Sequence, residues 1–181
     1  MSEETNPKQL EKQGQAAYKK KDFAAAADLF QEAARQFAVQ GEALQAAQMA
    51  NNWSVAALQA EDVNTAIAAV EGTPEIFLEE NDIGRAGMAY GNLGSAQEAA
   101  GLLDEALISY ERSASLLKEA GDHDTRLHVM QALSALQLRT GKQLQALATM
   151  QAGLEGGSKL SPKQQFLKKM LKLPNRFLSG E

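Results

Sequence analysis

A period of forty residues runs through this sequence and limits the folds that it can adopt. Four sets of residues at this spacing keep one character each: an invariant alanine, a tiny residue, a large residue and a second apolar position. The sets are Ala26, Ala66, Ala106 and Ala146; Gly14, Ser54, Gly94 and Ser134; Phe30, Val70, Tyr110 and Met150; and Ala27, Ile67, Leu107 and Leu147. Because they stay in phase over four copies, the sequence predicts a stack of similar units.

Each copy divides into two halves with a helical pattern. In the third copy Leu103, Ala106, Leu107 and Tyr110 follow the i, i+3, i+4, i+7 spacing of one buried helix face. Valine and isoleucine are few and no stretch alternates, so no strand is predicted. The halves and copies are separated by polar or glycine-bearing breaks, namely Lys20 to Asp22, Gly41, Glu61 to Asp62, Asn81 to Asp82, Gly101, Gly121 to Asp122, and Gly141. The aspartates suit helix N-caps and the glycines suit helix ends.

The second copy has an additional break inside its second helix, at Gly72, Thr73 and Pro74. We predict that the helix restarts there, with Thr73 as the N-cap and Pro74 as the first helical residue. The repeating sets themselves indicate helix pairing. A tiny residue on the first helix faces the alanine of the second, so that the two axes approach closely. Such units bury little surface alone and must stack.

The segment NLGSAQEAAGLLDEALISYERSASLLKEAGD, residues 92 to 122, resembles a tetratricopeptide (TPR) repeat of the long, forty-residue kind, most closely at Leu93, Gly94, Ala106 and Tyr110. The resemblance covers residues 7 to 155 as four copies. It implies an all-α, TPR-like right-handed solenoid of about four antiparallel helix pairs. We expect a disordered N-terminus at 1–6, repeats at about 7–40, 41–80, 81–120 and 121–157, and a basic C-terminal capping helix within 158–181.

Composition excludes several classes of function. The chain has no cysteine, and its net charge of −5 lacks the basic footprint of a general nucleic-acid binder. The opening MSEETNPKQLEKQ is polar, so it predicts neither a signal peptide nor a transmembrane start, and no apolar run is long enough to span a bilayer. A cytoplasmic location is expected.

No constellation of residues predicts catalysis, a cofactor or a metal. His123 and His128 are five residues apart, so their rings diverge by about 140° on a helix, and no third ligand has supporting spacing. The stretch GLEGGSKLS lacks the adjacent Gly-Lys-Ser/Thr of a phosphate loop, and no strand precedes it. We therefore expect a protein that is not an enzyme.

A run of glycines leaves two interpretations open. Gly84, Gly87, Gly91 and Gly94 lie within about 80° of arc on one helix, and each costs about 1 kcal/mol relative to alanine in a helix interior. The stripe is explained either by tight packing against neighbouring first helices or by a smooth groove floor that a partner's backbone approaches.

The TPR resemblance implies that first-helix residues line a concave groove, where asparagine commonly holds a bound peptide's main chain. Asn52 and Asn92, forty residues apart, fit that role, because an amide both donates and accepts. The alternative is that they are ordinary solvated polar residues. Some TPR adaptors hold a terminal carboxylate with lysine and arginine, but such a clamp is not predicted here. The predicted groove residues are Gln48, Asn52, Val55 and Gln59; Met88, Gly91, Asn92 and Ser95; and His128, Gln131 and Ala135.

These patterns predict a scaffold that binds a protein or peptide segment in its groove. The alternative is a membrane-peripheral assembly subunit anchored by the C-terminal tail. From 158 to 181, six basic residues and one acidic residue contribute +5, so the rest of the chain carries −10. On a helix Phe166, Leu167, Met170 and Leu171 share one side with lysines around it, which suits either docking on the last repeat or an anionic membrane surface.

Overall fold

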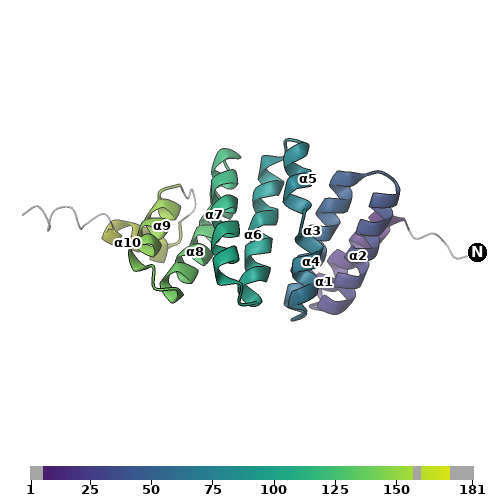
Figure 1. Ribbon diagram of the computed structural model, residues 1–181, viewed down its shortest axis with the longest axis horizontal. Coiled ribbons are helices and arrows are strands. Elements are labelled where there is room, and N and C mark those ends of the chain that lie inside the picture. The colour runs from purple at the N-terminus through teal and green to yellow at the C-terminus, as the bar shows by residue number, and fades with distance from the viewer. Residues whose placement is uncertain (1–5, 157–159, 172–181) are drawn as a thin grey trace, which may run out of the picture.

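The computed structural model describes residues 6–156 and 160–171, and every regular element in them is an α-helix (Figure 1). The helices are α1 (Pro7–Lys19), α2 (Phe23–Val39), α3 (Ala43–Gln59), α4 (Val63–Val70), α5 (Thr73–Glu79), α6 (Ile83–Ala99), α7 (Leu103–Glu119), α8 (His123–Arg139), α9 (Gln143–Gly156) and α10 (Pro162–Leu171). Apart from α4 and α5, consecutive helices pack side by side, and the stack runs along the longest axis of the molecule from α1 at one end to α10 at the other.

Apart from the α4–α5 break and the α9–α10 connection, the turns between helices repeat every twenty residues. At each turn one residue has a left-handed backbone, with φ between 57° and 78°. These residues are Lys21, Gly41, Glu61, Asn81, Gly101, Gly121 and Gly141. At four turns the next residue is an aspartate whose Oδ1 accepts the amide N–H three residues later, as predicted, namely Asp22, Asp62, Asp82 and Asp122. One local turn conformation therefore sets the length of nearly every helix.

Replacing the non-glycine residue at one of these turns should stabilise the protein. We expect Glu61→Gly to raise the free energy of unfolding by about 0.5–1 kcal/mol, since relief of the left-handed conformation outweighs the entropy cost of glycine. Conversely, Gly141→Ala should lower it by about 1 kcal/mol. No atom lies within 4 Å of a Cβ built at Gly141, so that loss reports backbone strain alone. Urea unfolding followed by circular dichroism measures both, and equal midpoints for the two variants would contradict the assignment.

The tiny residues of the forty-residue period are matched to the large ones. A Cβ added to Gly14 or Gly94 would lie 2.8 Å from the ring of Phe30 or Tyr110. In the other two copies the tiny residue is a buried serine, and its hydroxyl donates to a carbonyl of the invariant alanine set: Ser54 to Ala66 at 2.7 Å and Ser134 to Ala146 at 2.9 Å. The predicted facing of tiny residue and alanine therefore describes the serine copies, whereas an aromatic ring is the nearest neighbour of both glycines.

The break in the second copy produces two short helices, α4 and α5. Gly72, with φ of 78°, is the N-cap of α5, and Thr73 is its first residue. The Thr73 hydroxyl instead donates to the carbonyl of Val70 at 2.9 Å. The prediction of a restart is correct, but the cap is wrong by one residue because only glycine adopts this backbone easily. Phe77 then anchors α5, with 0% of its surface exposed.

The C-terminal helix α10 packs against α9. Its Gln164 and Leu167 line a small cavity of about 40 Å³ together with Leu127, Met130 and Leu154. The helix predicted after residue 158 therefore exists and contacts the last pair. The remainder of the tail, from 172 onward, lies outside the described residues.

Candidate partner-binding groove

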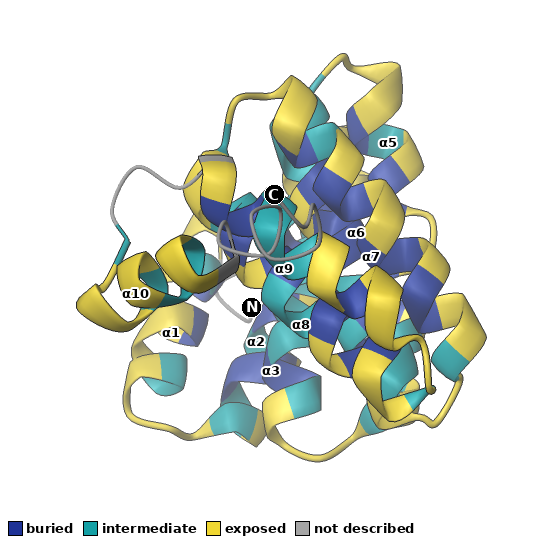
Figure 2. Cartoon of the chain, turned by 90° about the vertical axis from the view of Figure 1, so that its left-hand side faces the viewer, coloured by how far each residue is buried: buried dark blue, intermediate teal, exposed yellow. Residues whose placement is uncertain are grey.

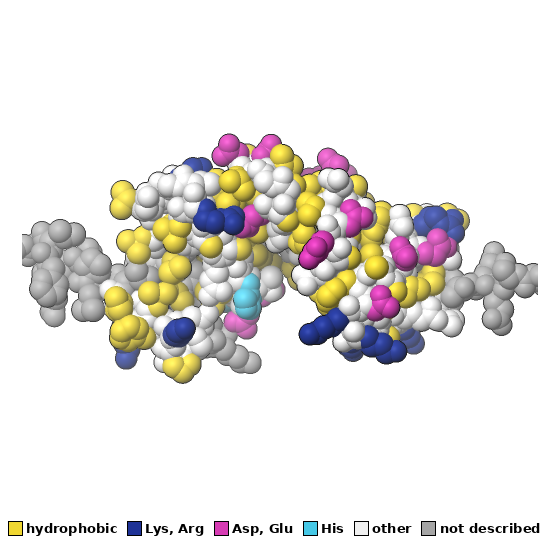
Figure 3. Space-filling view, turned by 90° about the horizontal axis from the view of Figure 1, so that it is seen from below, with side chains coloured by type: hydrophobic (Ala, Val, Ile, Leu, Met, Phe, Trp, Pro, Cys, Tyr) yellow, Lys and Arg dark blue, Asp and Glu magenta, His cyan; other side chains and the backbone are white. Residues whose placement is uncertain are grey.

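The predicted groove residues lie on the first helices of the second, third and fourth copies, which are α3, α6 and α8. They occur in register because α3, α6 and α8 begin at Ala43, Ile83 and His123, forty residues apart. Except for Gly91, all are half-buried or exposed. The space-filling view is hollowed in the middle of the molecule (Figure 3). We call the surface formed by the ten accessible residues the groove face.

Two hydrogen bonds made by side chains of this face join α3 to α6. The Asn92 Nδ2 group donates to Asn51 Oδ1 at 2.8 Å, and Arg85 Nη1 donates to Gln48 Oε1 at 3.1 Å. Arg85 is itself held by an ion pair with Asp82 at 2.5 Å. This hydrogen-bonded pair lowers the pKa of Asp82, so the carboxylate stays charged. Amides of the groove face therefore fix the spacing of the two helices.

Sequence reasoning missed Asn51 and Arg85. Asn51 directly precedes Asn52. It was not chosen as a partner of Asn92 because Asn52, and not Asn51, lies forty residues before Asn92. Arg85 stands three residues after the cap Asp82. Side chains at this spacing on a helix can contact each other, and that spacing was the one feature of the sequence that pointed to Arg85. Asn52 itself is half-buried and makes no hydrogen bond within the described part of the chain.

A second polar cluster includes Ser95 of the groove face. The Tyr110 hydroxyl lies 2.8 Å from Glu98 Oε2 and 3.2 Å from Ser95 Oγ. Arg139 of α8 forms an ion pair with Glu98. Burial raises the pKa of Tyr110, so the phenol remains a protonated donor at neutral pH. Ser95 is thus engaged in a cluster that links α6, α7 and α8.

The glycine stripe on α6 serves packing. A Cβ at Gly87 would lie 2.8 Å from Leu117 Cγ and 3.2 Å from the Leu117 backbone nitrogen. At Gly91 it would lie 3.1 Å from Ser113 Oγ and 3.3 Å from Val129 Cγ2. The Ser113 hydroxyl also donates to the Gly87 carbonyl at 2.6 Å. The principal partner is α7, the second helix of the same pair, whereas the packing interpretation placed the glycines against neighbouring first helices; only the Val129 contact, on α8, is of that kind.

Gly91 is therefore not a groove residue, although it was predicted to be one. It is buried between Ser113 and Val129, and a partner's backbone cannot reach it without separating these helices. The physical reason is the rotation of α6 about its own axis. That rotation turns the glycine side toward α7 and leaves Met88, with 38% of its surface exposed, on the accessible side.

The α8 part of the groove face lies next to the C-terminal helix. His128 and Ala135 are exposed, while Gln131 is half-buried and lines the small cavity beside Leu167 of α10. His123 is also exposed, at the start of α8. Among the described residues no group of three or more histidine, aspartate or glutamate side chains is arranged to hold a metal ion.

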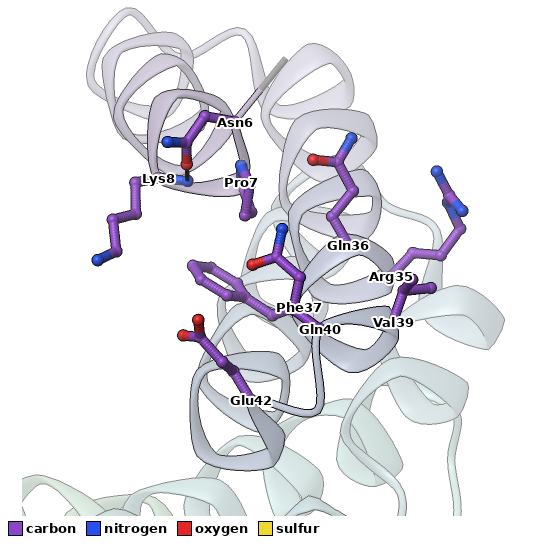
Figure 4. Close-up of a pocket in the computed structure, with 9 residues that line it drawn as sticks. All are labelled: Asn6, Pro7, Lys8, Arg35, Gln36, Phe37, Val39, Gln40 and Glu42. Carbon is purple, nitrogen blue, oxygen red and sulfur yellow. Dashed lines mark hydrogen bonds between the residues drawn. The ribbon is translucent and has the colours of Figure 1, made fainter. Parts of the chain in front are cut away.

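A separate hollow of about 610 Å³ lies at the N-terminal end and was not predicted (Figure 4). Its lining comes from the start of α1 and the end of α2, including Asn6, Pro7, Gln36 and Phe37. The hydrogen bond drawn there, from the Lys8 amide to Asn6 Oδ1 at 3.0 Å, is the cap of α1. This contact is structural.

Comparison with known proteins identifies the fold. No protein-family model matches the chain, and no curated protein does. Among solved structures, nearly identical TPR-like repeats from Podosopora anserina, described as a kinesin light chain, align over 100% of both chains with a TM-score of 0.69 and 13% identity. A single-substitution form of those repeats aligns over 94% of this chain and 88% of its own, with a TM-score of 0.73 and 16% identity.

Membrane-spanning segments were sought in the described residues, and none of the helices there is long and apolar enough to serve as one. The helix order, the pairing and the structural neighbours together give one conclusion: this chain folds as an all-α, right-handed solenoid of TPR-like repeats.

Proposed function

We propose that this chain is a non-enzymatic scaffold of forty-residue TPR repeats that holds a segment of a partner protein on its groove face. The observation that carries the proposal is the asparagine arrangement across α3 and α6. The Asn92–Asn51 hydrogen bond of 2.8 Å holds the two helices in place, while the Asn52 amide next to it makes no hydrogen bond among the described residues. An amide that is free both to donate and to accept a hydrogen bond, beside a neighbour that holds the helices in place, matches a peptide main chain.

Apolar side chains beside these amides would receive the side chains of the bound segment. Val55 is half-buried and Met88 is 38% exposed, on the two helices that carry the asparagines. Met is an adaptable contact because its side chain is unbranched and polarizable. A surface that combines amides with such contacts suits an extended segment, in which main-chain and side-chain groups alternate.

The test uses a displayed library of random peptides selected on the immobilised full chain. We expect the selected peptides to bind Asn52→Ala/Asn92→Ala about tenfold or more weakly, because each lost hydrogen bond contributes about 0.5–1.5 kcal/mol. Met88→Ala should weaken binding as well. The matched control is Asn64→Ala, which removes an exposed asparagine from α4.

Circular dichroism must show unchanged helical content in each variant. The proposal is wrong if peptides are selected that bind the double variant as tightly as the natural chain. It is also wrong if Asn64→Ala weakens binding as much as the groove changes do, since the effect would then not depend on the groove face.

A further inference from the structure

An apolar groove of about 790 Å³ lies between α2, α3 and the α4–α5 break, apart from the groove face. We call it the alanine groove. Its floor carries mostly methyl groups beside two large side chains, and its lining includes Ala34, Ala38, Ala46, Ala50, Trp53 and Ile76. Three carboxylates also line it, those of Asp28, Glu32 and Glu71, against one guanidinium, that of Arg35, which bonds Glu32 at 2.6 Å.

The groove is open because one side chain of the repeat is small in the second copy. Ala50 stands forty residues before Tyr90 and eighty before Met130, which are 5% and 6% exposed. Tyr90 shows how a large residue at this position of the repeat fills the space between helices. Its hydroxyl lies 2.7 Å from Glu75 of α5 and 2.6 Å from Arg112 of α7, so it bridges the second helices of consecutive copies. Ala50 leaves the corresponding space between α2 and α5 unfilled.

The other end of the molecule presents the complementary shape. Helix α10 begins at Pro162, about one period after the start of α8 at His123, so it takes the place of the next first helix. Its Met170 is the counterpart of Met130 and Tyr90, but 50% of it is exposed, and Phe166 one turn earlier is 65% exposed. Figure 2 shows α10 at the edge of the C-terminal end with exposed residues over much of its surface.

The two surfaces also carry opposite charge. Lys163 and Lys169 on α10 are exposed and Lys168 is half-buried. These lysines belong to the basic tail, while the alanine groove belongs to the part of the chain with an excess of acidic residues. Charge complementarity of this kind favours encounter and excludes wrong partners. Gln164 and Leu167 of α10 line the small cavity against its own α8–α9 pair, whereas Phe166 and Met170 stay exposed.

We propose that α10 of one molecule docks in the alanine groove of a second copy of this chain, with Phe166 and Met170 filling the space above Ala50. Docking within one molecule does not fit, because α10 and α2 lie at opposite ends of the long axis (Figure 1). Because groove and helix are different surfaces, the contact is heterologous. It therefore produces either a closed assembly or a growing chain, depending on the angle between successive copies.

Two variants test the groove and the helix separately. Ala50→Tyr fills the groove with the side chain that the third copy already accommodates, and Phe166→Ala/Met170→Ala removes the anchors from α10. In sedimentation velocity, we expect the natural chain to self-associate as its concentration rises and each variant alone to remain a monomer. An equimolar mixture of the two variants should form a dimer, since one contributes an intact groove and the other an intact helix.

Charge reversal gives a second test that leaves the packing untouched. Asp28→Lys/Glu71→Lys and Lys163→Glu/Lys169→Glu should each weaken association at least tenfold, and combining all four changes in one chain should restore it in part. The matched control is Leu144→Ala, which truncates an apolar side chain of α9 that is 85% exposed and should change nothing. Circular dichroism checks the fold of each variant.

Several outcomes would overturn the proposal. They include a natural chain that stays monomeric at every concentration, association that survives both Ala50→Tyr and the charge reversal of the groove, or association that Leu144→Ala abolishes. Co-sedimentation of a monomeric natural chain with phosphatidylserine vesicles, lost in Phe166→Ala/Met170→Ala, would show instead that α10 is a membrane-binding helix. None of these variants alters the groove face, so failure here leaves the proposed peptide binding to be tested independently.

Discussion

Phe77→Ala should lower the free energy of unfolding by about 3–5 kcal/mol, the usual cost of removing a fully buried phenylalanine. Phe77 is 0% exposed and packs in one cluster with Val70, Ala86 and Ala89. The guanidinium of Arg85 lies 5.3 Å from its ring centroid, so the substitution also removes a cation–π contact. Helix α5 has only seven residues and depends on this anchor, because a helix of that length is not stable alone.

The control for this prediction is the next residue along the same helix. Leu78 is 36% exposed, so Leu78→Ala should cost much less, about 1 kcal/mol or below. Urea unfolding gives both values, and amide hydrogen exchange over 73–79 should show α5 opening first in Phe77→Ala. Equal losses for the two substitutions would mean that Phe77 does not anchor α5.

Gly87→Ala should destabilise the protein by about 1–3 kcal/mol, although alanine is normally the better helix residue by about 1 kcal/mol. The added Cβ would lie 2.8 Å from Leu117 Cγ and 3.2 Å from the Leu117 backbone nitrogen. The side chain can shift, but the backbone of α7 cannot move without separating the two helices. The loss therefore measures how closely the axes of α6 and α7 approach.

Gly84→Ala is the matched control, three residues earlier on the same helix. Its nearest neighbour would be Ala120 Cβ at 3.8 Å, which is an ordinary contact. We expect this substitution to be neutral or to stabilise by a few tenths of a kcal/mol, since Gly84 lies near the helix start. If both alanines stabilise the protein, α6 and α7 are not in close contact at Gly87.

Helix boundaries could be predicted because they depend on neighbours in the chain. An aspartate such as Asp62 caps a helix by accepting an amide three residues on, and a glycine such as Gly101 adopts the left-handed turn by itself. Both events are complete within a few residues. The misplaced cap at Thr73 also has a local cause, because Gly72 and Thr73 are both suited to a helix start.

The role of the glycines on α6 could not be predicted. The spacing of Gly87 and Gly91 shows that they share a side of the helix, but spacing does not show what that side contacts. The bulk of Leu117 and the hydroxyl of Ser113, both on α7, decide that question, and neither is near the glycines in the chain. Gly91 was therefore included among the predicted groove residues although it is buried.

By itself, the sequence determined an all-α array of helix pairs, the forty-residue register and the first helices that carry Asn52 and Asn92. These properties follow from periodicity and local backbone preference. Only the tertiary structure decided that Asn92 bonds Asn51, that Ala50 leaves a groove where Tyr90 fills one, and that Phe166 stays exposed on α10. The reason is physical. Each of these outcomes depends on the rotation and separation of neighbouring helices, which are set by side-chain volumes many residues apart.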